Sequence, residues 1–431
     1  MTMLTYEQAL KAILDNCQPL SRETISLGNS LRRVIAEPIK ANFDLPQFNN
    51  SAVDGFGVLV EDLIGASPTN PATLTIIGEV SAGANPSLGN SSARLNPGQC
   101  IRILTGAPVP ADVEAIVMKE VCQTQEPLQK KENDQKQASQ PETIAVSTST
   151  RIGENIRLQG EEIEAGATVL QPGTRISPPV LGLIATLGVS ELSVYRTPRV
   201  AVISTGDELI EPGLPIAEGQ IYNSNSYALV AALNALGVTE VQRFHAKDNR
   251  AETSKVLQEA LDFADIVISA GGVSVGEYDF IKEVCEEQGV ETIFWRIAIK
   301  PGKPVYFGVN RSAKAGQLVF GLPGNPVSAL VTFNLFVRPA IARMQAASTT
   351  NRHFQAKAAR HLKKKAGRLD FVRGKLSLDN SIEISAMPTV GQESHMLTGL
   401  AKADCLMHFA RELEFLPEGE YIKVELLNWF E

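Results

Sequence analysis

The chain of 431 residues is too long for one ordinary hydrophobic core and favours about three or four domains. Its hydrophobic content of 44% and charged content of 20% are typical of a globular protein. A formal net charge of −8 disfavours a nucleic-acid-binding surface. No apolar run approaches membrane-spanning length, and the first residues do not resemble a signal peptide. We therefore expect neither a nucleic-acid partner nor a membrane location.

The cysteines are odd in number, widely scattered, and lack the C-x-x-C spacing of a metal site. They are Cys17, Cys100, Cys122, Cys285 and Cys405. Such a pattern predicts free thiols in a reducing cytoplasm.

The first part of the chain changes from a helix to short strands. Thr5 and Gln8 have capping-box spacing ahead of an apolar helical face, which predicts a helix at the start. From about Pro38, β-like runs broken by Gly, Pro and Asn follow. These runs are Ala72–Ile77, Cys100–Leu104 and Ala115–Met118. The glutamine-rich segment Gln123–Gln140 has almost no apolar residues, which predicts a mobile insertion in this β region.

The middle of the chain alternates strands with helices. Val200–Ser204 reads as a buried strand, and Asn223 or Ser224 then caps a helix that stops at Gly237. Ile266–Ser269 is a second strand of this kind. The alternation predicts a parallel sheet covered on both faces, with ligands at the carboxyl ends of its strands.

The last third begins with a long apolar helix after Pro326, which Pro339 should kink. After about Ala346 the pattern predicts a small all-β domain. Its expected strands are Phe371–Arg373, Ile382–Ile384 and Tyr421–Leu426. The basic run Lys363–Lys365 is interpreted as a solvated loop rather than as a nucleic-acid contact.

Two glycine–proline loops, residues 299–304 and 321–328, each adjoin a β-like run. Lys300 and Lys303 flank the first Pro-Gly pair, and Ser328 lies where a helix begins. Glycine permits close approach of a ligand, and proline stiffens the backbone. The pattern fits a rigid oxyanion site, and it fits two structural turns equally well.

Carboxylates follow several of the predicted strands. Glu208 and Asp279 lie just beyond two strands of one sheet, and Asp248 follows another. Because carboxyl ends of parallel strands meet at one edge, these side chains should converge, and their oxygens suit Mg²⁺. Each is also compatible with a helix cap, and Asp54 with an ordinary Asp-Gly turn. The chain lacks the P-loop and Rossmann glycine motifs, so the residues alone indicate a metal-dependent phosphoryl or oxyanion site.

Taken together, these stretches resemble the molybdopterin molybdenumtransferase family over nearly the whole chain, apart from 123–140. The matching motifs are residues 50–55, 102–110, 204–209, 271–279, 300–304 and 321–328. The resemblance implies a multidomain α/β plus β fold with a central doubly wound α/β domain of the molybdopterin-binding type. It implies an elongated helical linker domain (1–40 and 159–196), a small mixed β domain (41–158), the α/β domain (197–345) and a C-terminal β-barrel-like domain (346–431).

The resemblance also implies a reaction: insertion of molybdate into adenylylated molybdopterin, with release of AMP and a requirement for Mg²⁺. It implies a cytoplasmic homodimer with an active cleft between subunits, and a molybdopterin adenylyltransferase as the upstream partner. Water or a molybdate oxygen could attack phosphorus, and the sequence does not decide between them.

Site residues carry over by motif position. The residues implied to be catalytic are Asp54, Thr105, Glu208, Asp248 and Asp279. Those implied to bind molybdate or the pterin are Arg296, Lys300, Lys303, Pro304, Pro323, Pro326, Ser328, Arg373 and Ser394. Those implied to serve Mg²⁺ are Asp248, Asp279 and Glu162. Two positions depart from the family pattern: Glu162 stands where Asp is common, and Arg296 where Lys is frequent, which changes their reach and geometry.

Two alternatives belong to other classes. One is a molybdopterin adenylyltransferase, which resembles the central domain alone; the additional domains and the loop at 271–276 disfavour it. The other is a non-catalytic molybdopterin-binding scaffold, which in this family depends on a fused partner domain that the chain lacks.

Overall fold

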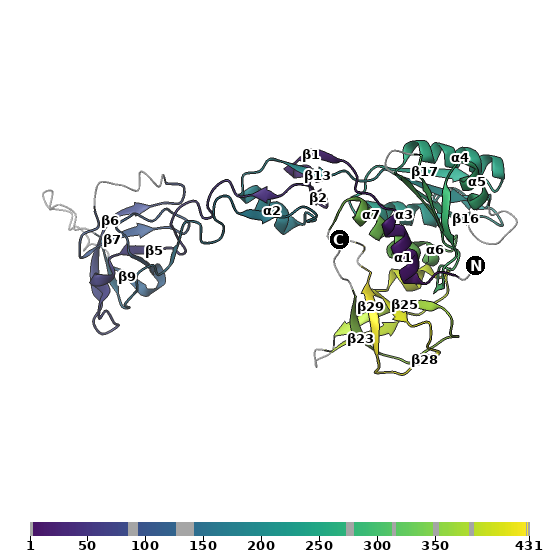
Figure 1. Cartoon of the computed structure of the whole chain (residues 1–431). Coiled ribbons are helices and arrows are strands. Elements are labelled where there is room, and N and C mark those ends of the chain that lie inside the picture. The colour runs from purple at the N-terminus through teal and green to yellow at the C-terminus, as the bar shows by residue number, and fades with distance from the viewer. Residues whose placement is uncertain are drawn as a thin grey trace. The chain divides into compact units, whose positions relative to one another are not determined.

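The computed structural model describes residues 3–84, 94–125, 142–272, 280–312, 316–347, 353–378, 383–427 and 429. The chain forms two compact units (Figure 1). The larger combines residues 1–37 with 171–431, and the smaller holds residues 38–170.

The larger unit contains a six-stranded sheet in the order β17-β14-β18-β22-β21-β19. Its strands are β14 (Val200–Thr205), β17 (Val241–Ala246), β18 (Ile266–Ala270), β19 (Glu291–Trp295), β21 (Tyr306–Asn310) and β22 (Gln317–Leu322). The neighbours β17, β14, β18 and β22 are parallel, as expected. In contrast, β21 is antiparallel to both β22 and β19. The connection between β21 and β22 is too short for the helical crossover that a parallel pair needs, so the two form a hairpin.

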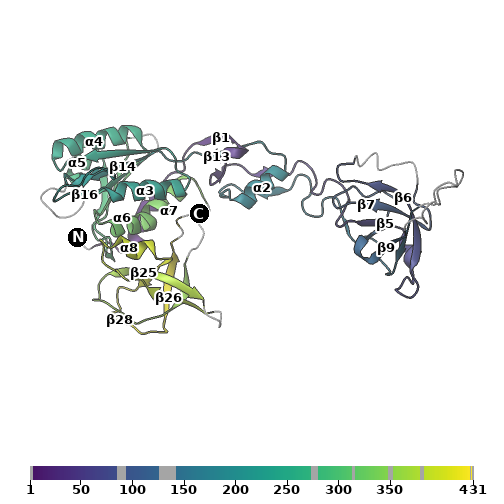
Figure 2. The ribbon, with the colours of Figure 1, turned by 180° about the vertical axis from the view of Figure 1, so that it is seen from behind.

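Helices cover both faces of this sheet (Figures 1 and 2). They are α1 (Tyr6–Asp15), α3 (Ser224–Ala235), α4 (Arg250–Phe263), α5 (Ile281–Glu287), α6 (Pro326–Thr332) and α7 (Arg338–Met344). In β14, Ala201 and Ile203 pack with α4 and α5, whereas Val200 and Val202 pack with α1, α3, α6 and α7. Burial on both faces explains why this strand is continuously apolar. The predicted caps are confirmed: Thr5 and Gln8 form a capping box, and the side chain of Asn223 caps α3.

The long helix is interrupted between α6 and α7 by a π-helical turn, Phe333–Val337. The turn lies immediately before Pro339, which lacks an N–H for the helical ladder and would clash with the preceding turn. Of the described helices, only the run Pro326–Met344 is long and apolar enough to cross a membrane, and 72% of it is buried inside the protein. It therefore serves as a core helix of the α/β domain.

The C-terminal strands close into a barrel, because β25 pairs with both β26 and β27. The five barrel strands are β23 (His353–Ala358), β25 (Leu369–Leu378), β26 (Ile384–Pro388), β27 (Cys405–Phe409) and β29 (Tyr421–Leu426). Two short strands, β24 (Leu362–Lys363) and β28 (Phe415–Leu416), pair beside it, and α8 (Leu397–Ala401) precedes β27. The predicted β-barrel-like domain is confirmed, although part of the predicted strand Ile382–Ile384 lies outside the described residues.

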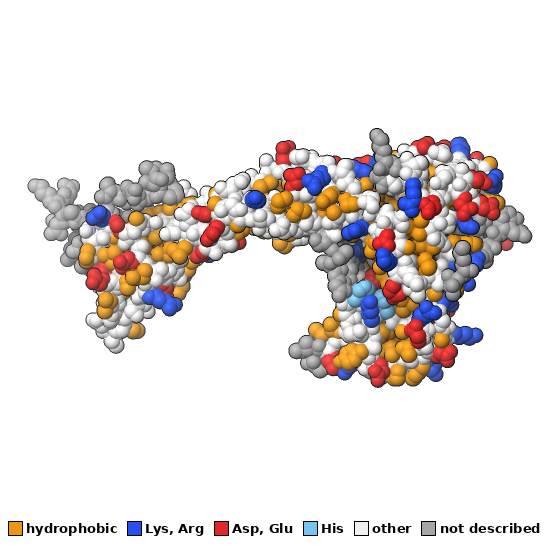
Figure 3. All heavy atoms as spheres, in the orientation of Figure 1, with side chains coloured by type: hydrophobic (Ala, Val, Ile, Leu, Met, Phe, Trp, Pro, Cys, Tyr) orange, Lys and Arg blue, Asp and Glu red, His pale blue; other side chains and the backbone are white. Residues whose placement is uncertain are grey.

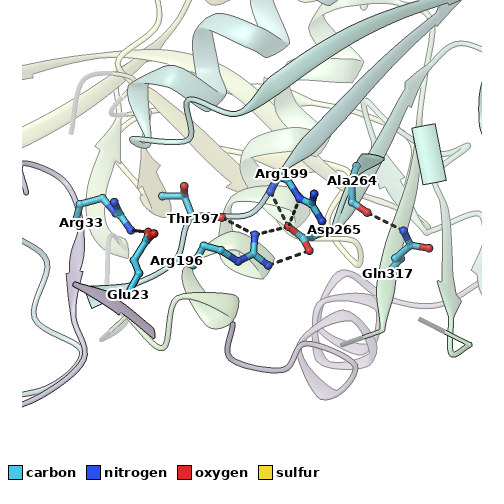
Figure 4. A network of polar contacts seen from close by, with 8 residues as sticks. All are labelled: Glu23, Arg33, Arg196, Thr197, Arg199, Ala264, Asp265 and Gln317. Carbon is cyan, nitrogen blue, oxygen red and sulfur yellow. Dashed lines mark hydrogen bonds and ion pairs between the residues drawn. The ribbon is translucent and has the colours of Figure 1, made fainter. Parts of the chain in front are cut away.

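The part of the predicted helical linker that belongs to the larger unit combines a sheet with a helix. Besides α1, which packs on the α/β domain, it contains the strands β1 (Arg22–Ser26), β2 (Val34–Ile35) and β13 (Glu191–Tyr195), the helix α2 (Pro178–Thr186) and a short 3₁₀ turn, Leu27–Asn29. The chain then enters the α/β domain through residues 196–199. There Arg196 donates two hydrogen bonds of 2.7 and 3.0 Å to Asp265, and the backbone N–H of Arg199 donates one of 2.7 Å (Figure 4). Burial raises the pKa of Asp265, but these partners outweigh burial and hold it below its usual value.

The smaller unit is built on a six-stranded sheet in the order β8-β5-β7-β6-β10-β9. Its strands are β5 (Gly55–Val58), β6 (Ala72–Val80), β7 (Gln99–Ile103), β8 (Ala115–Met118), β9 (Cys122–Gln125) and β10 (Thr143–Val146). Two short pairs complete it: β3 (Ile39–Lys40) with β12 (Thr168–Leu170), and β4 (Asn50–Ser51) with β11 (Ile156–Arg157). The start of the predicted insertion is part of this sheet, since Gln123–Gln125 pairs with β10. The rest of the predicted insertion lies outside the described residues.

Candidate functional site

A cavity of about 410 Å³ lies in the larger unit, where loops of the α/β domain meet the barrel. From the α/β side it is lined by Lys300, Pro301, Gly302, Lys303, Pro304, Pro323, Asn325 and Ser328. From the barrel side it is lined by Leu362, Lys363, Arg368, Asp370, Phe371, Val372, Arg373, Pro388, Gln392, Glu393, Ser394 and Phe409. We call it the basic cavity, because cationic side chains outnumber carboxylates in this lining.

The first glycine–proline loop reaches the barrel through strand β20 (Ile299–Lys300). This strand pairs in parallel with β25, so that Lys300 lies beside Asp370. At Gly302 φ is +102°, and a Cβ there would lie 2.4 Å from the Thr332 side chain. Only glycine lets the loop pack this closely against α6, which holds Lys300 and Lys303 at the cavity wall.

The second loop leads into α6 and is fastened on both sides. The N–H of Val327 donates a 3.2 Å hydrogen bond to the carbonyl of Ser394 in the barrel. The side chain of Asn225, in the first turn of α3, donates one of 2.6 Å to the carbonyl of Gly324. Ser328 is buried behind this loop, and Pro326 begins the helix without lining the cavity. The two loops therefore form adjacent rigid walls.

Arg373 has one of the largest buried side chains among the described residues, with 2% of its surface exposed. Its Nη2 donates to the carbonyls of Gly391 at 3.0 Å and Glu393 at 3.4 Å. Gln392 accepts from the Arg373 N–H and donates to the Arg373 carbonyl. Burial lowers the pKa of Arg373, opposed by nearby Glu393, yet a guanidinium remains charged in proteins. Its Nε has no hydrogen-bond partner within the described chain, which suits a site for an anionic ligand.

Some cavity residues were not predicted from the sequence. Asp370 lies 3.9 Å from Lys300 Nζ and 3.9 Å from Lys364 Nζ. The interpretation of Lys363–Lys365 as a solvated loop is wrong in part. Lys363 lines the cavity, and the Lys364 side chain is only 5% exposed and donates a hydrogen bond to the Arg368 carbonyl. The basic run was the available signal in the sequence, but it gave no indication that Lys364 lies close to Asp370 of β25.

Only some of the carboxylates that were predicted at the carboxyl-end edge of the sheet lie within the described residues. Asp207 and Glu208 follow β14, and Asp248 follows β17, its N–H donating a 3.4 Å hydrogen bond to Asp207 Oδ1. The loop after β18 packs tightly here: a Cβ on Gly271 would lie 2.7 Å from Thr205 Oγ1. Asp279 lies outside the described residues. Adjacent parallel strands thus bring Glu208 and Asp248 to the same edge, as predicted.

Arg296 does not join the residues around the basic cavity. The guanidinium of Arg296 stacks 4.1 Å above the centre of the Trp295 ring. The backbone N–H of Arg296 donates a hydrogen bond to the carbonyl of Val305. Its φ of +80° is unusual for a side chain other than glycine. The structure therefore gives it a stacking contact and a backbone role.

In the smaller unit, Asp54 and Thr105 lie together as one cluster. Asp54 Oδ1 accepts from the Thr105 N–H at 2.9 Å and from its hydroxyl at 2.8 Å. Lys119, which was not predicted, donates to Oδ2 at 3.0 Å. The Thr105 hydrogen bonds, followed by Lys119, hold the pKa of Asp54 well below its usual range. Glu162 is exposed in this unit and donates its N–H to the Leu45 carbonyl.

Comparison with known proteins places this geometry in a family. Three family models match in chain order: MoeA N-terminal region (domain I and II) over residues 4–188, probable molybdopterin binding domain over 201–343, and MoeA C-terminal region (domain IV) over 355–427. The chain is 37% identical over 429 residues to the molybdopterin molybdenumtransferase of Haemophilus influenzae, and the match covers 99% of each chain. The chain belongs to the molybdopterin molybdenumtransferase family.

Two further similarities cover almost the whole length of this family member. It is 35% identical over 427 residues to molybdopterin molybdenumtransferase 2 of Mycobacterium tuberculosis, covering 97% of this chain and 98% of that one. It matches a crystal structure of the molybdopterin biosynthesis moeA protein from Pyrococcus horikoshii with a TM-score of 0.76 at 28% identity, covering 99% and 100%. The resemblance inferred from the motifs and the multidomain α/β plus β fold are thereby confirmed.

Proposed function

We propose that this protein is a transferase that inserts molybdate into adenylylated molybdopterin and releases AMP in a Mg²⁺-dependent reaction. One observation carries the proposal: Lys300, Lys303 and Ser328 share the basic cavity with Arg373 and Ser394. The relatives at 35–37% identity bear the name molybdopterin molybdenumtransferase, which supports the reaction class.

The basic cavity suits molybdate because a tetrahedral dianion needs cations and hydrogen-bond donors in fixed positions. Lys300 and Lys303 supply ammonium groups from one wall, and the Ser328 hydroxyl a donor from the other. Arg373 supplies a guanidinium held in place by backbone carbonyls. Pro304 and Pro323 stiffen the walls, and Pro326 starts the helix behind them. Arg296, outside this lining, is proposed to contact the pterin phosphate.

The carboxylate edge suits Mg²⁺ because carboxylate oxygens are the hard ligands this ion prefers. We assign Asp248 and Asp279 to the ion and the adenylate phosphates, with Glu208 close by on the same edge. When bound, Mg²⁺ would offset the negative charge that develops as the phosphoanhydride is cleaved. No side chain is needed as a nucleophile.

Asp54 and Thr105 are proposed to act at the cleft of a second subunit in a cytoplasmic homodimer. The Asp54 carboxylate is ionised and is held in place by hydrogen bonds from Thr105 and Lys119. It is also partly exposed, unlike the buried carboxylate of a structural ion pair, which supports a role at a cleft. Glu162, on the same unit, is proposed to reach the metal in this assembly. A molybdopterin adenylyltransferase would supply the adenylylated substrate.

The proposal is tested with purified protein, adenylylated molybdopterin, molybdate and Mg²⁺. We expect the release of AMP, which is measured by chromatography. We also expect molybdenum-loaded cofactor, which is detected because it activates a molybdoenzyme apoprotein. Omitting Mg²⁺ should abolish AMP release, and Lys300→Ala should reduce molybdenum loading. Absence of AMP release from the folded wild-type protein with all components present would overturn the assignment.

A further inference from the structure

A second cluster of potential ligands lies on the barrel, apart from the basic cavity lining. His353 lies on β23, His408 on β27 and Glu425 on β29. His353 and Glu425 are direct cross-strand partners. Each residue offers a ligand atom, and the three atoms lie within 4.8 Å of one another.

The cluster faces outward from the barrel toward the α/β domain. The alternate residues of β27, Met407 and Phe409, belong to the barrel core, whereas the His408 ring packs edge-on against Phe371 and Tyr6. His408 and Glu425 are each 8% exposed, while His353 is only partly buried. Histidine atoms are visible at the surface of the larger unit in Figure 3. The partly buried His353 gives an ion a route to the cluster from solvent.

Two atoms of the cluster are incompletely satisfied. His408 Nε2 and Glu425 Oε2 are buried and 3.4 Å apart, and neither has a hydrogen-bond partner in the part of the chain that is described. Buried polar atoms are normally paired, because leaving them unpaired costs the free energy of removing them from water. A cation between the side chains would satisfy both atoms.

The carboxylate is oriented by a neighbour outside the barrel. The side chain of Asn334, in the π-helical turn, donates a 3.0 Å hydrogen bond to Glu425 Oε1, and Arg338 donates one of 3.2 Å to the side-chain oxygen Oδ1 of Asn334. This leaves Oε2 directed to His408. Such outer hydrogen bonds, which fix a ligand's orientation, are typical of protein metal sites.

We propose that His353, His408 and Glu425 bind one Zn²⁺ ion, which clamps three barrel strands beside the core helix. Two imidazole nitrogens and one carboxylate oxygen suit Zn²⁺, whereas Mg²⁺ prefers oxygen ligands alone. With metal–ligand distances of about 2.0–2.2 Å, the ligand atoms must approach to about 3.5 Å of one another, which small side-chain rotations achieve. Water would occupy the fourth tetrahedral position. The site is independent of the Mg²⁺ of the proposed reaction.

Binding is tested on the full-length protein after removal of metals with a chelator and extensive dialysis. Calorimetric titration with Zn²⁺ should show one binding site per chain, and millimolar Mg²⁺ should not compete for it. The Zn²⁺-loaded protein should have a higher melting temperature than the metal-free protein. Substituted Co²⁺ should show the visible absorption of a tetrahedral ion with nitrogen and oxygen ligands. A Co²⁺ spectrum dominated by thiolate charge transfer would instead assign the metal to cysteines and overturn the proposal.

Matched variants separate this site from adventitious binding. Glu425→Gln retains an oxygen for Asn334 but removes the charge, and His353→Asn alters the most exposed ligand; each should weaken Zn²⁺ binding at least about tenfold. His361→Ala, an exposed histidine elsewhere, should leave it unchanged. If the folded wild-type protein binds no Zn²⁺, or if both site variants bind it as the wild type does, His408 and Glu425 form only an ion pair and the proposal fails.

Discussion

Lys300 and Asp370 are partners on two parallel strands, with Lys300 Nζ 3.9 Å from Asp370 Oδ2. The other carboxylate oxygen, Asp370 Oδ1, lies 3.9 Å from Lys364 Nζ. One buried carboxylate therefore lies close to two lysines from different segments of the chain. Burial raises the pKa of Asp370, and the neighbouring Lys364 and Lys300 offset only part of this rise. The pair joins the first glycine–proline loop of the α/β domain to the barrel and holds Lys300 at the cavity lining.

Lys300→Ala should weaken molybdate binding about 10- to 100-fold, because a charge-assisted hydrogen bond contributes about 1.5–3 kcal/mol. Equilibrium dialysis with molybdate measures this change. Lys375→Ala, an exposed lysine on β25 outside the cavity lining, is the matched control and should bind as the wild type does. Equal affinity for Lys300→Ala and wild type would remove Lys300 from the anion site.

Thr105→Val and Lys119→Met should each raise the pKa of Asp54 toward the ordinary value of about 3.9. Each variant removes only part of the cause, because Thr105→Val keeps the backbone N–H, which is the largest cause, and Lys119→Met keeps both Thr105 hydrogen bonds. Carbon-detected NMR titration of the Asp54 carboxylate measures both shifts. Glu120→Gln is the control, and an Asp54 pKa that stays unchanged in both Thr105→Val and Lys119→Met would contradict the assigned causes.

The sign of that shift also predicts a pH profile. A depressed pKa keeps Asp54 ionised as the pH falls below the usual carboxyl range. Loss of AMP release between about pH 7 and pH 5 therefore cannot come from Asp54, and Thr105→Val should leave that part of the profile unchanged. A shift of the acid limb within this window by Thr105→Val would show that Asp54 titrates there.

At a molybdate concentration too low to saturate Lys300→Ala, mixed dimers of Asp54→Asn and Lys300→Ala should recover activity that is reduced in each variant alone. If each cleft combines Asp54 of one subunit with Lys300 of the other, one cleft of the mixed dimer has both residues, giving about half of wild-type activity. Co-expression with two affinity tags isolates the mixed dimer for the AMP-release assay. An inactive mixed dimer would place both residues in the same subunit's cleft, and a monomeric protein would exclude the shared cleft altogether.

Asp265→Asn should lower the free energy of unfolding by about 2 kcal/mol at pH 7, because hydrogen bonds from Arg196 and Arg199 lose their charged acceptor. The pKa of Asp265 in the folded protein lies below its value of about 4 in the unfolded chain. The stabilisation is therefore complete above the unfolded pKa and is lost as the pH falls through the folded pKa. Urea unfolding at several pH values should show the difference from wild type shrinking between about pH 5 and pH 3. A constant difference over that range would contradict the assigned cause. Asp262→Asn, exposed on α4, is the control.

Much of the architecture follows from local sequence. The run Val200–Ser204 predicted a buried strand of a sheet covered on both faces, and Thr5 with Gln8 predicted a capped helix; both are present. Short-range periodicity, capping and glycine–proline chemistry act within a few residues and can be read directly. They did not predict the antiparallel β21, because strand direction depends on how the connection returns to the sheet.

The sequence by itself determined the two rigid loops, the two lysines of the first loop and the order of the family motifs. Only the tertiary structure decided that Arg373 is buried against the carbonyls of Gly391 and Glu393 in the same cavity as Lys300. It alone brought His353 beside His408 and Glu425. The physical reason is that these residues are far apart in sequence and share no local periodicity. Their charges are brought together by closure of the barrel and its packing on the α/β domain.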